Sequence, residues 1–179
     1  QDPEVIMVGE VRDAETARTA IQAGLTGHLV VSTIHSGTAA GVFTRLLDMG
    51  VEPYLAASSV TGVLAQRLVR VVCPDCAGPY TPGAGLAAAF GLADFSGPFR
   101  RGRGCEACQG IGFKGRTAIG ELLAVNERFT ERVLSRVRTS ELQDAAIDSG
   151  MRPLAAAGAQ CVRDGVTTLD ELKRVLPAM

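Results

Sequence analysis

Short apolar runs alternate with amphipathic stretches in the first third of the chain. Residues 5–8 form one run and residues 29–34 form another. Each is followed by a stretch with helical spacing, and the first of these begins after Asp13, a residue type that often caps helices. This order predicts an α/β fold with two parallel strands buried on both faces. Ligands of such sheets gather at the carboxyl ends of the strands, where Glu10 and His35 occur.

The middle of the chain predicts a hairpin with a long insertion. Residues 53–59 are expected to form a short helix, and residues 64–72 and 117–125 read as strands that can pair with each other. Between the two strands lies a segment rich in glycine and proline, in which local propensity favours no regular element. We therefore expect an insertion at the tip of a hairpin.

From Glu127 onward the pattern is helical and predicts a small helical subdomain. Apolar residues recur at helical spacing, and Ser140 and Thr168 each precede an acidic or amide residue by three positions, which is the pattern of a capping box.

Composition removes several functional classes. The 179 residues are 46% apolar and 21% charged with a formal net charge of −1, so a soluble globular chain is expected. A dedicated nucleic-acid binder carries a basic excess that this chain lacks, and we expect no nucleic-acid partner. The apolar runs are far shorter than the roughly 20 residues that cross a bilayer, so no transmembrane segment is expected.

Four of the five cysteines form two C-x-x-C pairs, Cys73 with Cys76 and Cys105 with Cys108. Each pair lets two thiolates converge on one side of a metal, and two pairs complete the tetrahedral site that zinc prefers. Two disulfides or a redox pair are the alternatives. Neither pair follows a strand-to-helix pattern, so we favour structural zinc. Cys161 stands alone and is expected to be a small apolar residue of the core. A zinc site of free thiolates implies a reducing, cytoplasmic compartment.

The first strand delivers an acidic residue to the edge of the predicted sheet, in the manner of a Walker B strand. Such a carboxylate, here Glu10, can orient an attacking water or help to hold Mg²⁺ beside a terminal phosphate. The second strand ends in Thr33 and His35, at the place where a sensor of that phosphate belongs. Taken alone, an apolar run that ends in glutamate is a weak signal.

The motifs together resemble the C-terminal half of the secretion ATPases, the hexameric motors of type II secretion systems and of type IV pilus assembly. The stretches that carry this resemblance are, in order, DPEVIMVGEVRDAETARTAIQAGLTGHLVVSTIHSGTAA, LLDMGVEP, GVLAQRLVR, CPDC and GCEACQGIGFKGRTAIGELL. They cover essentially the whole chain. The resemblance implies a partial RecA-like P-loop ATPase core, a zinc-binding hairpin insertion and a C-terminal helical subdomain.

Four segments follow from this resemblance. Residues 1–72 are expected to be the C-terminal part of the RecA-like core, residues 73–116 the tetracysteine insertion, residues 117–125 the returning core strand and residues 126–179 the helical subdomain.

The same resemblance implies roles for single residues. Glu10 corresponds to the catalytic Walker B glutamate and His35 to the second histidine of the family's histidine box, of which His28 would be the first. Gly9, Arg12, Thr33 and His28 are expected to contact the nucleotide. Gly9 stands where many P-loop enzymes place an aspartate that holds the metal, so a role of this strand in Mg²⁺ binding is less secure than the role of Glu10.

Arginines raise a second possibility at the edge of the site. Arg12, Arg67 and Arg70 could stabilise charge across a subunit boundary, or they could simply solvate the surface.

No G-x-x-x-x-G-K-[ST] loop occurs in these 179 residues. We therefore expect a fragment that is inactive alone, with a P-loop about 50 to 80 residues upstream of Gln1 in the intact protein. The resemblance further implies ATP and Mg²⁺ as cofactors, a homohexamer, and a location in the cytoplasm, peripheral at the inner membrane, beside platform proteins of a secretion or pilus system. The alternative is a stand-alone zinc-binding adaptor for a protein or a nucleic acid.

Overall fold

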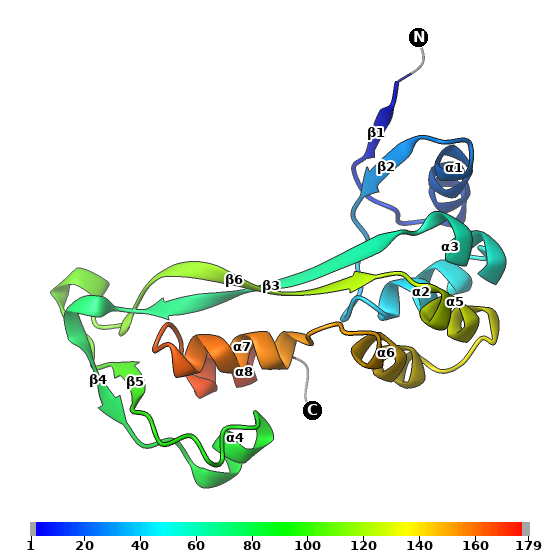
Figure 1. The fold of residues 1–179 in the computed structure, drawn as a ribbon. Helices are drawn as coiled ribbons and strands as arrows, with labels where there is room; N and C mark the ends of the chain where they lie inside the picture. Colours follow the sequence, from blue (N-terminus) through cyan, green and yellow to red (C-terminus); the bar gives the residue numbers. More distant parts are fainter. Residues whose placement is uncertain (1–2, 177–179) are drawn as a thin grey trace. The chain divides into compact units, whose positions relative to one another are not determined.

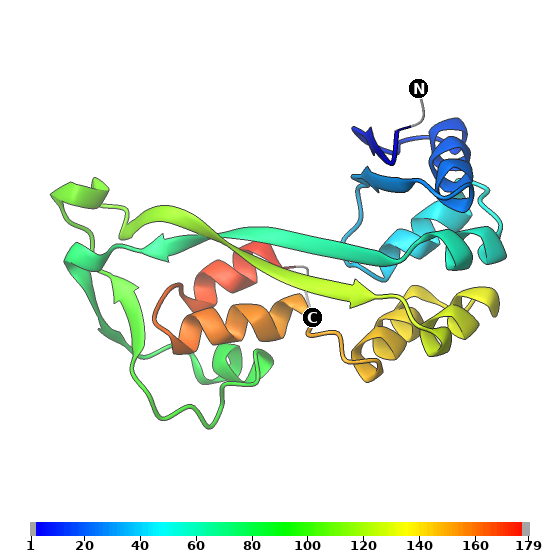
Figure 2. The ribbon, with the colours of Figure 1, turned by 45° about the horizontal axis from the view of Figure 1, so that its top comes forward.

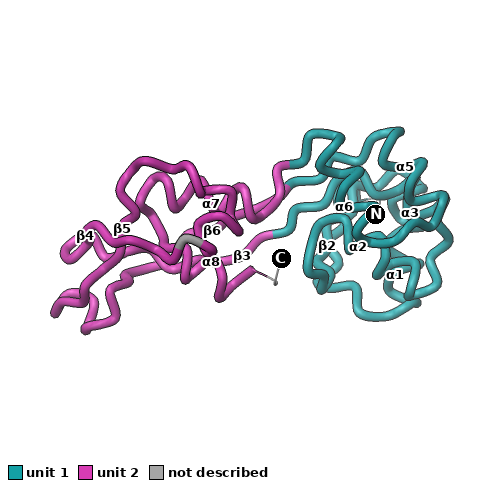
Figure 3. The backbone as a smooth tube through the Cα atoms, turned by 90° about the horizontal axis from the view of Figure 1, so that it is seen from below, with its two compact units in different colours: residues 1–65, 122–151 teal, residues 66–121, 152–179 magenta. Residues whose placement is uncertain are grey.

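The computed structural model describes residues 3–176, which form an α/β fold of two compact units. The first unit, called unit 1, joins residues 1–65 with residues 122–151, and the second, called unit 2, joins residues 66–121 with residues 152–179 (Figure 3). The chain passes between the units three times. Each unit is therefore built from two segments that are distant in the sequence.

Unit 1 contains a small parallel sheet and five helices. Strand β1 pairs with β2 in parallel, with Val5 opposite Leu29 and Val8 opposite Ser32 (Figure 1). The elements are β1 (Val5–Val8), α1 (Ala14–Leu25), β2 (Leu29–Ser32), α2 (Gly41–Asp48), α3 (Pro53–Ser59), α5 (Glu127–Leu134) and α6 (Thr139–Asp148). The predicted strand, helix, strand, helix order and the helix over residues 53–59 are confirmed.

Local capping explains where α1 begins. The Asp13 carboxylate accepts a hydrogen bond of 2.8 Å from the peptide N–H of Thr16, which satisfies one of the free donors of the first turn. This confirms the expected cap.

The prediction that both faces of the sheet are buried is wrong for the described residues. Val5 and Met7 lie on one face together with their partners Leu29 and Val31, and all four side chains are exposed, Met7 by 79%. Alternation along the strands turns Ile6 and Val30 to the other face, where they are half-buried. The reason is that two strands with α1 beside β2 offer cover for one face only.

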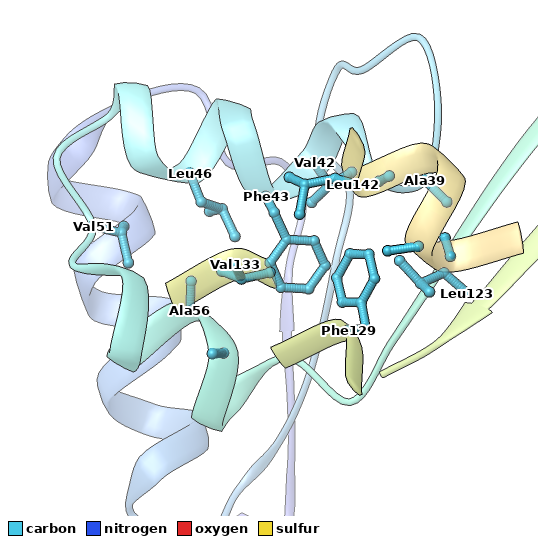
Figure 4. Close-up of a cluster of buried hydrophobic side chains, with 14 of the residues drawn as sticks. Ala39, Val42, Phe43, Leu46, Val51, Ala56, Leu123, Phe129, Val133 and Leu142 are labelled. Atoms are coloured by element: carbon cyan, nitrogen blue, oxygen red, sulfur yellow. The ribbon is translucent and has the colours of Figure 1, made fainter. Parts of the chain in front are cut away.

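The core of unit 1 lies between helices that come from both of its segments. Phe43 of α2 and Phe129 of α5 are fully buried, and their ring centroids lie 5.0 Å apart in an edge-to-face arrangement (Figure 4). Leu46, Val133 and Leu142 pack around them. The core is complete only when residues 122–151 join residues 1–65.

Strands β3 (Gly62–Val72) and β6 (Phe113–Ala124) pair with each other, and their arrows point in opposite directions (Figures 1 and 2). The expected hairpin is thus confirmed. The first strand begins two residues earlier than the pattern indicated, and the second begins four residues earlier and ends one residue earlier. All four paired cysteines lie between the end of β3 and the start of β6.

Unit 2 contains the cysteine segment. Strand β4 pairs with β5 in an antiparallel manner, and helices α7 and α8 contact each other. Its remaining elements are β4 (Ala77–Tyr80), α4 (Ala84–Ala89), β5 (Phe99–Gly102), α7 (Leu154–Arg163), α8 (Leu169–Val175) and two 3₁₀ turns, Pro74–Cys76 and Glu106–Cys108. Buried Val69, Ile119, Leu169 and Leu172 form its core, and Cys161 is partly buried against it.

A buried carboxylate ties β3 to α8 within unit 2. Both oxygens of Glu171 accept hydrogen bonds from Arg174, and both also accept from Arg70, one through its peptide N–H and the other through its guanidinium. Burial opposes the charged form of Glu171, but the bonds from Arg174 and Arg70 lower its pKa to about 2. Arg70 also lies 4.2 Å over the ring of Phe113.

Neither expected capping box is complete, although one of the two caps is present. Helix α6 begins at Thr139, so Ser140 lies inside its first turn and does not cap it. Thr168 does cap α8, since its hydroxyl accepts a hydrogen bond of 3.1 Å from the peptide N–H of Glu171. The Glu171 side chain does not return the bond, because both of its oxygens bind arginines. The helices after residue 126 are shared between the units, with α5 and α6 in unit 1 and α7 and α8 in unit 2.

Candidate functional site

Backbone hydrogen bonds fix the segment that follows β1. The Thr33 hydroxyl donates a hydrogen bond of 2.7 Å to the carbonyl of Gly9, and the peptide N–H of Val11 donates one of 2.8 Å to the carbonyl of Thr33. Glu10 lies between these two anchors. The parallel register therefore continues past the strands, and it presents Glu10 at their carboxyl ends, as expected.

The side chain of Glu10 meets two other predicted site residues. Its Oε1 lies 2.8 Å from Nε2 of His35, and its Oε2 accepts a hydrogen bond from Arg12. Only 18% of the Glu10 side chain is exposed, whereas Arg12 is 75% and His35 is 91% exposed. The hydrogen bond from Arg12 and the charge of that residue lower the pKa of Glu10. Glu10 is therefore an ionised acceptor that is sheltered from water and has two exposed partners.

His28 is not part of this group. It precedes β2, whereas His35 follows it, so the two histidines lie at opposite ends of a strand. The ring Nδ1 of His28 lies 3.1 Å from the carbonyl of Ala23 and 3.2 Å from the Thr26 hydroxyl. The structure thus brings together Gly9, Glu10, Arg12, Thr33 and His35 and leaves His28 at the other edge of the sheet.

The other arginines lie elsewhere in the chain. Arg70 belongs to unit 2, where Glu171 and Phe113 hold it, and this contact is the ordinary structural alternative to a role across a subunit boundary. Arg67 is also in unit 2.

The four paired cysteines form a second candidate site, within unit 2. All of their Sγ atoms lie within 4.8 Å of one another. The distance is 3.9 Å from Cys73 to Cys105, 3.8 Å from Cys76 to Cys108 and 3.7 Å from Cys105 to Cys108. Four sulfurs bound tetrahedrally to zinc at about 2.3 Å would lie about 3.8 Å apart. The cluster therefore fits a tetrahedral zinc ion.

Backbone N–H groups donate hydrogen bonds to one of these sulfurs, which favours its thiolate form. Peptide N–H groups of Cys105 and Gly112 each donate to Sγ of Cys108 at 3.2 Å. These bonds, that of Cys105 foremost, lower the pKa of the Cys108 thiol although burial opposes the charge. Burial has the opposite outcome at Cys73, whose pKa it raises. A bound cation would stabilise the Cys73 thiolate and so offset the effect of burial, because metal ligation needs thiolates.

Sequence reasoning named Thr33 and Arg70 but not the contacts that hold them, and it missed Gly112 and Glu171. Thr33 was expected to face the nucleotide, but its hydroxyl binds the Gly9 carbonyl. The peptide N–H of Gly112 bonds a cysteine sulfur, and glycines on both sides of the second pair were the available signal. No signal was available for Arg70 and Glu171, which are separated by 101 residues.

Comparison with known proteins assigns the chain to a family. Residues 1–174 match the family model described as "Type II/IV secretion system protein". The chain belongs to this family. It is 46% identical over 176 residues to the type II secretion system protein E of Pseudomonas aeruginosa, a match that covers 98% of this chain and 35% of that protein. It is 43% identical over 175 residues to the type IV pilus assembly ATPase PilB of Thermus thermophilus, covering 96% of this chain and 20% of that protein.

Solved structures show the same fold. The pilus retraction motor PilT, solved with bound ADP, aligns with 99% of this chain and 41% of its own, at a TM-score of 0.67 and 23% identity. The ATPase DotB of Yersinia pseudotuberculosis aligns with 96% of this chain and 36% of its own, at a TM-score of 0.62 and 23% identity. The α/β fold is thereby confirmed, as is the resemblance on which the sequence analysis relied.

The family member described here spans about a third of the length of the secretion relatives that it matches. Among residues 3–176, no helix combines the length and the hydropathy that a bilayer-spanning segment needs.

Proposed function

We propose that this chain is the part of a secretion or pilus ATPase that carries the hydrolytic carboxylate and a structural zinc site. Family membership supports the class of protein. The observation that carries the catalytic assignment is the position of Glu10: a sheltered, ionised carboxylate, anchored on both sides by hydrogen bonds to Thr33, at the carboxyl ends of two parallel strands.

Glu10 is assigned the role of accepting a hydrogen bond from the water that attacks the γ-phosphate of ATP. An ionised carboxylate is an acceptor only, and its rigid backbone anchors favour one orientation of that water. His35 lies within hydrogen-bond distance of Glu10 and is exposed, so it can hydrogen-bond the γ-phosphate at the same edge of the sheet. Thr33 acts as the positioning residue, because its hydroxyl holds the peptide before Glu10.

Gly9 and Arg12 complete the proposed nucleotide contacts. Gly9 leaves open space beside the strand, since a side chain there would meet nothing within 4 Å. Arg12 is exposed and can turn from Glu10 to a phosphate, to which a guanidinium binds well. His28 is left out of this site because it lies at the opposite end of β2. ATP and Mg²⁺ would be held chiefly by a P-loop, which this sequence does not contain.

The intact protein is proposed to be a homohexamer in the cytoplasm, peripheral at the inner membrane, where it would drive a secretion or pilus platform. Within this chain, residues 1–72 with the returning strand 117–125 would serve the RecA-like core. The helices of residues 126–179 would be divided, with α5 and α6 packed in unit 1 and α7 and α8 in unit 2. Residues 73–116 would form the zinc-binding insertion, with Cys73, Cys76, Cys105 and Cys108 as the ligands.

The test uses the reading frame extended upstream until it includes the P-loop. Glu10→Gln keeps the size of the side chain but removes its charge, so ATP turnover is expected to fall by about 10²- to 10⁴-fold while nucleotide binding is retained. Glu15→Gln is the matched control, because Glu15 is an exposed carboxylate in the first turn of α1.

Unchanged turnover in the Glu10→Gln protein would remove the catalytic assignment. An upstream sequence without a P-loop would remove the ATPase proposal as a whole and leave a zinc-binding adaptor as the better description.

A further inference from the structure

Four glycines bracket the second cysteine pair. Gly102 and Gly104 precede Cys105, and Gly110 and Gly112 follow Cys108. The chain enters this loop from β5 and leaves it into β6, so the two flanks must approach each other closely.

The approach is closer than any side chain allows. A Cβ atom on Gly102 would lie 1.9 Å from the carbonyl oxygen of Gly112, and one on Gly112 would lie 2.5 Å from that of Gly102. A Cβ on Gly104 would lie 2.6 Å from the carbonyl oxygen of Gly110. Gly112 also has a φ of +78°, which a residue with a side chain adopts only with strain. Backbone packs directly against backbone at both levels of the loop.

Gly112 connects the two cysteine pairs through its backbone. Its N–H donates a hydrogen bond of 3.2 Å to Sγ of Cys108, in the second pair. Its carbonyl accepts a hydrogen bond of 3.0 Å from the N–H of Cys73, in the first pair. A shift of this one residue would therefore move a ligand sulfur of one pair and the backbone of the other.

We propose that Gly112, held in place by Gly102, is a positioning residue of the zinc centre that sets the geometry of its ligands. The inference rests on the proposed zinc site and adds what holds its ligand sulfurs in one arrangement. Groups that hydrogen-bond metal ligands orient them and tune their basicity, and losing such a group weakens metal binding about 10- to 100-fold. Here the supporting group is a main-chain N–H, so only a change that displaces the backbone can remove it.

The test compares two alanine variants with a matched control in the full 179-residue chain. Gly112→Ala places a Cβ against the Gly102 carbonyl, and Gly102→Ala displaces Gly112 without altering it. Gly115→Ala is the control, because Gly115 has a φ of +79°, almost that of Gly112, but a Cβ there would meet nothing within 4 Å. It carries the same backbone strain without the clash.

Zinc affinity is measured by competition with a chromophoric chelator, and cobalt is used as a spectroscopic probe. Both Gly112→Ala and Gly102→Ala are expected to bind zinc about 10- to 100-fold more weakly than the parent chain. Their thiolate-to-cobalt charge-transfer band is expected to shift, because the N–H to sulfur bond at Cys108 is lost. Gly115→Ala is expected to keep both the affinity and the band.

Each outcome bears on a different claim. If the parent chain binds no zinc, the zinc site itself is wrong. If the parent binds zinc and both clash variants match it in affinity and in the cobalt band, the inference about Gly112 is wrong while the site stands. If Gly112→Ala fails to fold, Gly102→Ala and the control decide. An equal loss in Gly115→Ala would assign the effect to backbone strain and overturn the positioning role.

Discussion

The two candidate sites are built in opposite ways. At the carboxylate site, Glu10 is sheltered, but its partners Arg12 and His35 are mostly exposed. At the cysteine site, the sulfurs lie among one another, and peptide groups of the same loop donate to Cys108. One site depends on side chains that reach into solvent, and the other depends on backbone that is packed against backbone.

This difference teaches what each site needs to function. The cysteine cluster has a full set of four ligands within 36 residues, so it can hold a metal ion without help from other parts of a protein. The carboxylate has an orienting backbone and two exposed partners, but the described residues contain no P-loop to bind the phosphates. We therefore expect the metal site to work in this chain and the carboxylate site to need the rest of the ATPase.

The largest expected effect is the loss of a zinc ligand, which should weaken the cysteine site and leave unit 1 unchanged. Cys73→Ser removes a zinc ligand, and zinc affinity is expected to fall by more than about 100-fold, because even the loss of a supporting group reaches that range. Hydrogen exchange is expected to speed up in residues 73–116 and to stay slow in α2 and α5. Cys161→Ser is the control, since Cys161 lies outside the cluster. Faster exchange throughout unit 1 would show that the two regions fold as one.

The reverse experiment destabilises unit 1. Phe129→Ala removes a fully buried ring that packs on Phe43, and we expect the free energy of unfolding of unit 1 to fall by about 3–5 kcal/mol. Cobalt absorption at the cysteine cluster is expected to be unchanged. Leu172→Ala is the matched change in the core of unit 2 and should leave exchange in α2 and α5 slow. Loss of the cobalt spectrum in Phe129→Ala would contradict the separation.

A smaller effect tests the buried carboxylate of unit 2. Glu171→Gln is expected to lower the stability of unit 2 at neutral pH by about 2 kcal/mol, less than the full pKa shift implies because Arg70 and Arg174 are half-exposed and screened by water. The folded pKa of Glu171 is about 2 and its ordinary value is 4.5. The carboxylate therefore stabilises the fold above pH 4.5, and this contribution is lost as the pH falls toward 2.

The measurement is urea unfolding of both proteins at several pH values. The difference in the free energy of unfolding between the parent and Glu171→Gln is expected to shrink on acidification. Zinc release at low pH affects both proteins equally, so it does not contribute to this difference. Glu141→Gln is the control: Arg138 also lowers the pKa of Glu141, but that pair is on the surface. A constant difference from pH 7 to pH 3 would count against this explanation.

The smallest effect concerns the carboxylate site alone. In Arg12→Ala the pKa of Glu10 is expected to rise toward its ordinary value, because the hydrogen bond from Arg12 is the main cause of its lowering. A carbon-detected NMR titration of the glutamate carboxyls measures this. Arg18→Ala, at an exposed position of α1, should leave Glu10 unchanged. No change in Arg12→Ala would mean that the ion pair does not persist in solution.

Much of the fold could be predicted because its signals are local. The apolar runs of residues 5–8 and 29–34 contain the two strands, Asp13 caps the following helix, and Pro53 opens a helix at its first position. The hairpin followed from two apolar strands that flank a stretch unable to form regular structure. Both candidate sites could be predicted from the positions of residues along the sequence. Ligands bind at the carboxyl ends of parallel strands, and two C-x-x-C pairs are typical of a metal site.

The rest depended on contacts that sequence distance conceals. The pattern after residue 126 predicts helices, but it cannot tell that Phe129 packs on Phe43 whereas Leu172 packs in the other unit. The exposed face of Met7 was read as buried because an apolar run looks the same with or without a covering layer. The first histidine, His28, was grouped with Glu10 by resemblance, although the start of a strand is remote from its end.

The three passages of the chain between the units have a consequence for synthesis on the ribosome. Residues 1–65 cannot complete their core until Phe129 has emerged, and by then the exit tunnel has already released the four cysteines of the cluster, which all precede Phe129. The order of emergence lets the nascent chain capture a metal before its first segment has closed. With zinc at the proposed site, the availability of zinc during translation, and not only afterwards, would affect how this chain reaches its fold.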